Sequence, residues 1–142
     1  MDKITVTMED GFITTARNEG GLEVHADLPP DSGADSAINP EEMLLAALGS
    51  CMAQTAKLYA NRKGWVIDKV EISLEVERFN AKDYADYDGD ERFVHEIREH
   101  IVFHGDLDDE QKARLLEITG KCPVRRVIST PTIFKELRPA TS

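Results

Sequence analysis

The sequence is poor in the residues on which disulfide-rich, zinc-binding and membrane-spanning proteins depend. Its 142 residues include two cysteines, Cys51 and Cys122, too few for the disulfide framework of a small secreted protein. They lie far apart and do not form the CxxC spacing of a structural zinc site. No run of 18 apolar residues occurs, as a membrane-spanning helix would need, and the first ten residues, MDKITVTMED, lack the apolar core of a secretion signal. We therefore expect a cytoplasmic protein with no membrane partner.

Positive charge is also scarce. There are 17 Lys and Arg residues against 27 Asp and Glu residues, a formal net charge of −10. Binding to phosphates requires clustered Lys and Arg, and the sole adjacent arginines in the sequence are Arg125 and Arg126. This composition argues against nucleic acid as a partner. The length and the 41% hydrophobic content suit one compact domain, residues 1–142.

The first part of the chain reads as three short strands. Residues 3–8, 11–17 and 22–28 are strand-like runs, and turns containing Asp10-Gly11 and Gly20-Gly21 separate them. Such spacing is typical of an antiparallel meander.

A long helix is expected next. Residues 39–42 (NPEE) combine a capping residue, a proline suited to the first helical position and two acidic residues. Residues 43–56 contain no charge, which predicts a helix buried on every side, and Lys63-Gly64 is a stop signal. One sheet covers only one side of a helix, so we expect a homodimer in which two sheets enclose the central helices.

The second half predicts a hairpin, two helices and a final strand. Residues 66–79 and 92–104 form two long strands, helices begin at Asp108 and Pro123, and residues 133–137 form the last strand. The residues of the first long strand expected to face inward are Val66, Val70, Ile72, Leu74 and Val76. The predicted fold is α+β, with the order βββ-α-ββ-α-α-β.

Each cysteine has two interpretations. A free cysteine usually packs as a small buried hydrophobe, and burial leaves its thiol inert. Cys51, however, directly follows Gly49-Ser50, and a helix break there would place its thiolate at the positive end of a new helix. Cys122 lies between two predicted helices and close to Arg125-Arg126. Neither residue identifies a function alone.

Two groups of possible metal ligands have unsuitable spacing. Asp86, Asp88 and Asp90 lack the twelve-residue ligand pattern of a calcium loop. His100 and His104 share a strand face but are about 13 Å apart, too far for one ion. We predict no metal site.

Two motifs resemble those of the OsmC/Ohr family, the osmotically inducible and organic hydroperoxide resistance proteins. They are residues 39–55 (NPEEMLLAALGSCMAQT) and residues 121–128 (KCPVRRVI), and they look closer to the OsmC-like branches than to Ohr itself. The family signature is an Asn-Pro-Glu helix start, a nucleophilic cysteine ten residues after that glutamate, and a later Cys-Pro. The resemblance implies an intertwined homodimer that reduces organic hydroperoxides, is recycled by a dithiol of the lipoyl type and binds no cofactor.

The resemblance also implies a role for each site residue. Cys51 is the nucleophile that the peroxide oxidises to a sulfenic acid, and Cys122 resolves it as a disulfide. Arg17 is the expected activator of the Cys51 thiolate, and Glu41 the residue that orients Arg17. Arg78 or Arg125 could take the place of Arg17.

The assignment carries a geometric requirement and has a rival. Ten residues of unbroken helix span about 15 Å, so bringing Glu41 to Cys51 requires a break at Gly49-Ser50 or a bend. The rival is a non-enzymatic dimer that binds an apolar ligand or senses oxidation stoichiometrically. In a third interpretation both cysteines are structural and lie too far apart to bridge. Aromatic residues of the hairpin turn are either an apolar entrance for the substrate or exposed: Phe79, Tyr84 and Tyr87.

Overall fold

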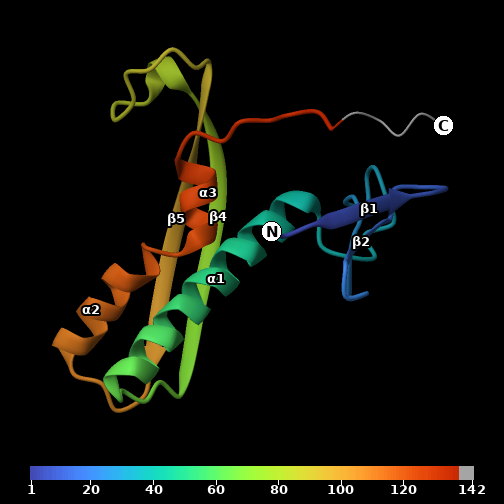
Figure 1. Ribbon diagram of the computed structural model, residues 1–142. Coiled ribbons are helices and arrows are strands. Elements are labelled where there is room, and N and C mark those ends of the chain that lie inside the picture. The colour runs from blue at the N-terminus through green and yellow to red at the C-terminus, as the bar shows by residue number, and fades with distance from the viewer. Residues whose placement is uncertain (138–142) are drawn as a thin grey trace. The chain divides into compact units, whose positions relative to one another are not determined.

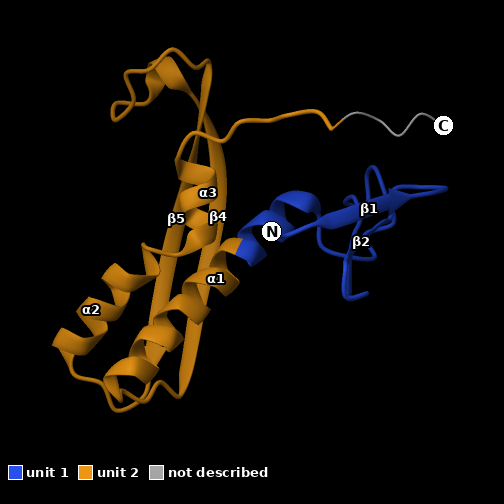
Figure 2. Ribbon diagram, in the orientation of Figure 1, with its two compact units in different colours: residues 1–47 blue, residues 48–142 orange. Residues whose placement is uncertain are grey.

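The computed structural model describes residues 1–137, and the chain divides into two compact units, residues 1–47 and residues from 48 onward (Figure 2). Each unit contains an antiparallel sheet, and the elements follow the expected α+β order as far as the third helix (Figure 1). Their bounds are β1 Ile4–Met8, β2 Thr14–Asn18, β3 Glu23–Ala26, α1 Pro40–Lys63, β4 Lys69–Asn80, the 3-10 turn η1 Ala81–Asp83, β5 Phe93–His104, α2 Asp109–Thr119 and α3 Pro123–Ser129.

The first unit contains the predicted meander. The strands pair in the order β1-β2-β3, with Arg17 of β2 opposite both Thr5 and Glu23. Gly21, in the turn between β2 and β3, has a φ of 85°, a conformation that favours glycine. The alternating apolar residues of β1 are more than half exposed in the single chain: Ile4, Val6 and Met8.

A buried carboxylate organises the loop between β3 and α1. Asp27 is 2% exposed and accepts hydrogen bonds from the Leu28 amide at 2.7 Å, the Ser36 amide at 3.1 Å and the Ser36 hydroxyl at 2.7 Å. A Cβ atom on Gly33 would lie 2.7 Å from Asp27 Oδ1, so glycine is required there. The hydrogen bonds from Ser36 lower the pKa of Asp27, and the loop closes around an ionised side chain.

Helix α1 is continuous from Pro40 to Lys63, so the break at Gly49-Ser50, one of the two ways of bringing Glu41 to Cys51, is absent. The helix begins with a capping box, in which the Glu42 amide donates to Asn39 Oδ1 at 2.9 Å and the Asn39 amide donates to Glu42 Oε1 at 3.0 Å. Gly49 instead allows α1 to pack closely on β4, because a Cβ atom there would lie 3.3 Å from Leu74 Cδ1.

The single chain buries one stripe of α1 rather than its whole circumference. The buried residues recur every fourth position: Leu48, Met52, Ala56 and Ala60. Leu44, which continues this stripe toward the start of the helix, is 47% exposed, and Leu58, away from the stripe, is 64% exposed. Cover for the rest of the helix by a second chain stays a prediction.

The second unit is built on the predicted hairpin. β4 and β5 pair along their full length, from Lys69 opposite His104 to Asn80 opposite Phe93. The inward positions of β4 are half-buried as expected, with one correction: Val66 is exposed, because β4 begins at Lys69, and Ile67 is buried in its place. On the exposed side of the hairpin, three carboxylates bond Arg98: those of Glu75, Glu77 and Glu96.

Helices α2 and α3 begin where the sequence predicts. Asp108 caps α2 through a reciprocal capping box with Gln111, and Pro123 occupies the first turn of α3. The expected strand over residues 133–137 is not formed within the described chain. Ile133, Phe134 and Leu137 are at least 80% exposed, and a strand requires a neighbour to supply its hydrogen bonds.

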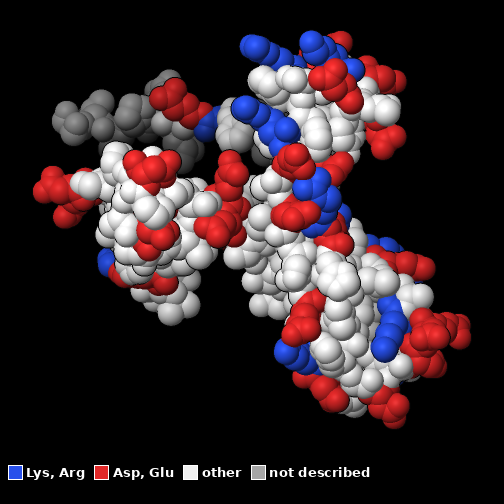
Figure 3. Space-filling view, turned by 180° about the vertical axis from the view of Figure 1, so that it is seen from behind, with Lys and Arg blue, Asp and Glu red and all other residues white. Residues whose placement is uncertain are grey.

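The interior of the second unit contains two apolar clusters, formed where α1, α2 and the start of α3 lie on the hairpin (Figure 1). The first is centred on Ala56, Ala60, Ile67, Phe103 and Leu115. The second is centred on Leu48, Met52 and Cys122. On the surface shown in Figure 3, Lys and Arg side chains are interspersed with more numerous Asp and Glu side chains. Within residues 1–137, no helix is both long enough and apolar enough to span a membrane.

Candidate functional site

The two cysteines meet in the second apolar cluster. Cys122 is 1% exposed, and Cys51, on α1, is half-buried against it. Cys51 also contributes to the raised pKa of Cys122, and both thiols are free in the described chain. Two cysteines far apart in the sequence thus form a neighbouring dithiol in one apolar cluster.

Local sequence fixes the position of Cys122. It is the residue that caps α3, and its Sγ accepts a hydrogen bond from the Arg125 backbone amide at 3.3 Å. Pro123 follows at the first helical position, where the lack of an amide hydrogen costs nothing. The sequence Cys-Pro therefore directs the thiol inward at the beginning of a helix.

The surroundings of Cys122 disfavour the thiolate form of its side chain. Burial raises its pKa, and the adjacent Cys51 adds to this effect. The Arg125 backbone hydrogen bond and the Arg125 charge act in the opposite direction without cancelling the effect of burial. Cys122 is therefore harder to ionise than a thiol in water.

A charged pair lies beside the dithiol. Arg125 Nη2 forms an ion pair with Glu99 of β5 and lies 3.8 Å from the sulfur of Met52, the neighbour of Cys51 on α1. Arg125 Nε is buried and has no hydrogen-bond partner within residues 1–137. The sequence left Arg125 open as an alternative activator, and Glu99 was not among the predicted site residues.

The structure does not bring Arg17 and Glu41 together. Arg17 bonds Glu23 across the strands, with Nε 2.7 Å from Oε1, and its side chain is 60% exposed. Glu41 is exposed in the first turn of α1, and residues 1–137 contain no ion pair between Arg17 and Glu41. Because α1 is unbroken, Glu41 and Cys51 are separated by about 15 Å along the helix. Their roles at Cys51 stay predictions.

The hairpin turn holds the remaining candidates. Arg78 stacks on Phe93, with its guanidinium carbon 4.6 Å from the ring centroid. Phe79 and Tyr84 pack against each other at 5.5 Å between ring centroids. Tyr84 also donates a 2.6 Å hydrogen bond to Glu96. These contacts give Arg78 and the turn aromatics structural partners within the hairpin.

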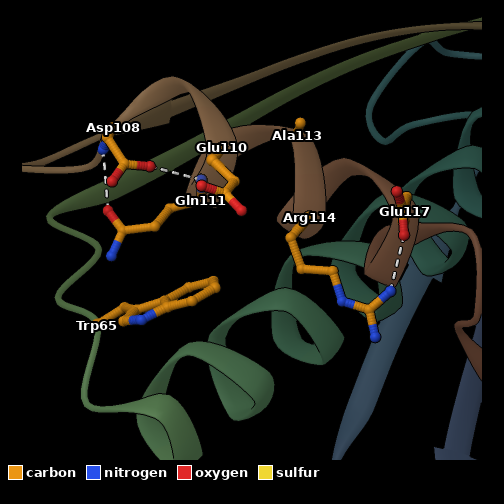
Figure 4. Close-up of a pocket in the computed structure, with 7 residues that line it drawn as sticks. All are labelled: Trp65, Asp108, Glu110, Gln111, Ala113, Arg114 and Glu117. Carbon is orange, nitrogen blue, oxygen red and sulfur yellow. Dashed lines mark hydrogen bonds and ion pairs between the residues drawn. The ribbon is translucent and has the colours of Figure 1, made fainter.

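A separate groove of about 500 Å³ lies beside α2 (Figure 4). Its lining comprises Trp65, Asp108, Glu110, Gln111, Ala113, Arg114 and Glu117. Arg114 donates hydrogen bonds to Glu117 at 2.7 Å and to the Tyr59 hydroxyl at 3.1 Å. Neither cysteine lines this groove. No group of three or more His, Cys, Asp or Glu side chains in residues 1–137 is placed to hold a metal ion.

A family model described as OsmC-like protein matches residues 33–136, which include both cysteines. The chain belongs to the OsmC-like family. Similar folds occur among solved structures, including three that are each less than 25% identical to this chain. An OsmC-like protein from Mycoplasma pneumoniae is 20% identical, with a TM-score of 0.71 and coverage of 91% of this chain and 87% of that chain.

Two of these solved structures are organic hydroperoxide resistance proteins. One, from Legionella pneumophila, is 18% identical, with a TM-score of 0.63 and coverage of 90% and 88% of the two chains. The other, OhrB from Bacillus subtilis, is 20% identical, with a TM-score of 0.59 and coverage of 89% of each chain. No curated protein matches the sequence. These likenesses establish the OsmC-like fold, and the dithiol lies within the part that the family model matches.

Proposed function

We propose that this OsmC-like protein is a thiol peroxidase that reduces organic hydroperoxides through Cys51 and Cys122. The observation that carries the proposal is the adjacency of the two free thiols, which are distant in the sequence and share one cluster. Family membership supports the choice of substrate, since related folds include organic hydroperoxide resistance proteins.

The difference in burial supports the two proposed roles. Cys51 is half-buried, whereas Cys122 is 1% exposed with a raised pKa. A peroxide therefore meets Cys51 first. The Cys51 thiolate attacks the outer peroxide oxygen, the O–O bond breaks, and the products are an alcohol and a sulfenic acid on Cys51.

The second half-reaction uses the buried thiol. Cys122 attacks the sulfenic sulfur, the S–O bond breaks, and a Cys51–Cys122 disulfide and water are formed. An external dithiol then reduces this disulfide by thiol–disulfide exchange and is itself oxidised to a disulfide. We propose a reductant of the lipoyl type, with no bound cofactor.

The proposal includes a homodimer and the two remaining predicted residues. In the single chain, part of α1 and the apolar residues of β1 are exposed, and a second copy would cover them. Arg17 as activator and Glu41 as its partner complete the proposed site. Light scattering at micromolar concentration is expected to give a dimer, and Arg17→Ala is expected to lower the reactivity of the Cys51 thiol.

The deciding experiment adds one equivalent of cumene hydroperoxide to the reduced protein. Intact mass is expected to fall by two hydrogens, and non-reducing peptide mapping to show a Cys51–Cys122 cross-link. Cys122→Ser is expected to stop at a sulfenic acid on Cys51 that dimedone traps, while Cys51→Ser gives no rapid reaction.

Turnover is then measured with dihydrolipoate as reductant. Two free thiols after peroxide addition, or slow overoxidation of Cys51 alone, would overturn the two-cysteine mechanism. A cross-link that forms without turnover by any dithiol would identify a stoichiometric sensor rather than an enzyme.

A further inference from the structure

The buried thiol presents an electrostatic problem within the proposed function. Cys122 must carry negative charge when it attacks the sulfenic acid, and again when it departs during reduction of the disulfide. It is nevertheless 1% exposed in an apolar cluster, where a charged sulfur is costly. Arg17 and Glu41, the charged residues that the resemblance supplies, are both assigned to Cys51.

The structure places one cation in position to act on Cys122. Arg125 follows it by one turn of α3, donates its backbone amide to Cys122 Sγ, and its charge favours the thiolate. The titratable groups acting on the thiol from neighbouring elements are Cys51 of α1 and Arg125 of α3. Glu99 of β5 acts through its ion pair with Arg125, and Lys121 is an exposed sequence neighbour.

The arrangement of the guanidinium leaves one buried donor, Nε, without an acceptor in the described chain. Nη2 forms the ion pair with Glu99, and the same nitrogen lies 3.8 Å from the sulfur of Met52. Nε is buried and unpartnered within the described chain. A buried donor without an acceptor costs free energy. Such an atom is explained if an anion, formed during the reaction, becomes its acceptor.

We propose that Arg125 stabilises the anionic form of the Cys122 sulfur during resolution and reduction, and that Glu99 is a positioning residue that holds the guanidinium beside the dithiol. This inference rests on the proposed function. It gives the resolving cysteine its own charged pair, separate from the Arg17 and Glu41 assigned to Cys51.

Arg125 assists the step in which Cys122 forms the disulfide with the Cys51 sulfenic acid. The Cys122 thiol gives up its proton, and the electron pair on its sulfur forms the S–S bond as the S–O bond of the Cys51 sulfenic acid breaks. The departing hydroxide combines with that proton as water. When the disulfide is later reduced, a thiolate of the external dithiol attacks Cys51, and the electron pair of the S–S bond moves to the Cys122 sulfur beside Arg125.

The test titrates Cys122 without any peroxide. In a Cys51→Ser background, thiolate absorbance at 240 nm is followed against pH, and the spectrum of a Cys51→Ser/Cys122→Ser protein is subtracted to remove tyrosine. Arg125→Met is expected to raise the midpoint by about one pH unit, a tenfold loss of thiolate at fixed pH. Arg125→Lys keeps the positive charge, so its midpoint is expected to stay close to that of the parent protein. Arg126→Met changes an exposed neighbour and is expected to leave the midpoint unchanged.

Glu99 is tested through its dependence on Arg125. Glu99→Ala frees the guanidinium, whose side chain is already 30% exposed, and is expected to raise the midpoint. In an Arg125→Met background the same change is expected to have no effect. A lowered midpoint in Glu99→Ala, or an equal shift in both backgrounds, would overturn the positioning role.

A kinetic measurement separates this inference from the proposed function. After one equivalent of cumene hydroperoxide, Arg125→Met is expected to slow disulfide formation about tenfold while oxidation of Cys51 keeps its rate. If Cys51 does not react with the peroxide, the proposed function fails and the titration still decides the role of Arg125. Equal midpoints in Arg125→Met, Arg125→Lys and the parent protein would overturn the inference. An unchanged rate of disulfide formation in Arg125→Met would also overturn the inference.

Discussion

The contact between Gly49 and β4 determines what one added methyl group should do. Gly49→Ala improves helix propensity by about 0.8–1 kcal/mol. The new Cβ atom would lie 3.3 Å from Leu74 Cδ1 and 3.8 Å from Ile72 Cγ2. The first distance is shorter than the usual 3.5–4.0 Å contact, so the Leu74 methyl must move by a few tenths of an ångström. Overpacking of this kind costs about 1–3 kcal/mol. Leu74 is half-buried, which favours the lower end of that range.

The two effects oppose each other and should nearly cancel. We expect Gly49→Ala to change the free energy of unfolding by less than about 1 kcal/mol. In a Leu74→Ala background the obstructing methyl is gone, and the same substitution is expected to stabilise by about 1 kcal/mol relative to that background. Gly49→Val adds bulk without the propensity gain of alanine and is expected to destabilise by about 2 kcal/mol.

The measurement is a double-mutant cycle by urea unfolding, followed by circular dichroism at 222 nm and fixed protein concentration. Unchanged m-values are needed to compare midpoints. An effect of Gly49→Ala that is the same with Leu74 and with Ala at position 74 would refute the packing explanation. It would indicate instead that glycine serves the backbone of α1, as the helix-break interpretation assumed.

Two further predictions concern stability. Leu115→Ala removes a fully buried side chain and is expected to lower the free energy of unfolding by about 2–5 kcal/mol, measured in urea. Leu116→Ala, at a 47% exposed position, is expected to lower it by less than about 1 kcal/mol. Similar losses for the two variants would contradict the assigned burial. Asp27 has a lowered pKa because Ser36 bonds its ionised form, so its contribution is present above the unfolded pKa of about 3.9 and lost as pH falls through the folded value. Asp27→Asn is therefore expected to destabilise more at pH 7 than at pH 3 in unfolding experiments, and equal destabilisation at both values would contradict this.

Local signals in the sequence were sufficient for most of the fold. The cap over residues 39–42, the alternation along β4 and the Asp108 cap each depend on neighbours within a few positions. Such features are set by backbone hydrogen bonding and by side-chain period. The three-stranded meander was likewise predicted from local signals, the short strand-like runs and the glycine-containing turns of residues 3–28.

The sequence was least informative where packing between distant residues decides the structure. Gly49-Ser50 has the composition of a helix break, and only the proximity of Leu74 explains the glycine within a continuous helix. Residues 133–137 have the composition of a strand but lack a partner strand within the described chain. Val66 continues the alternating pattern, yet the turn before Lys69 leaves it exposed.

The same distinction applies to the site. The resemblance identified Cys51 and Cys122, and the structure shows them as neighbours. The position of Arg125, one turn after Cys122, was visible in the sequence, but Glu99 belongs to a strand distant from it in the chain. Only the packing of α3 against β5 brings that carboxylate to the guanidinium. A sequence pattern carries no signal for such a contact.

The unequal burial of the two sulfurs has a consequence for chemical damage. Cys122 lies beneath the surface and Cys51 is partly open, so a reagent arriving from solvent reaches the α1 sulfur first. Irreversible modification, whether by excess oxidant or by a bulky electrophile, should therefore accumulate on Cys51 while the deeper sulfur stays intact. In aged protein the number of free thiols per chain would therefore fall from two toward one, and this number would report how many molecules still have both cysteines intact.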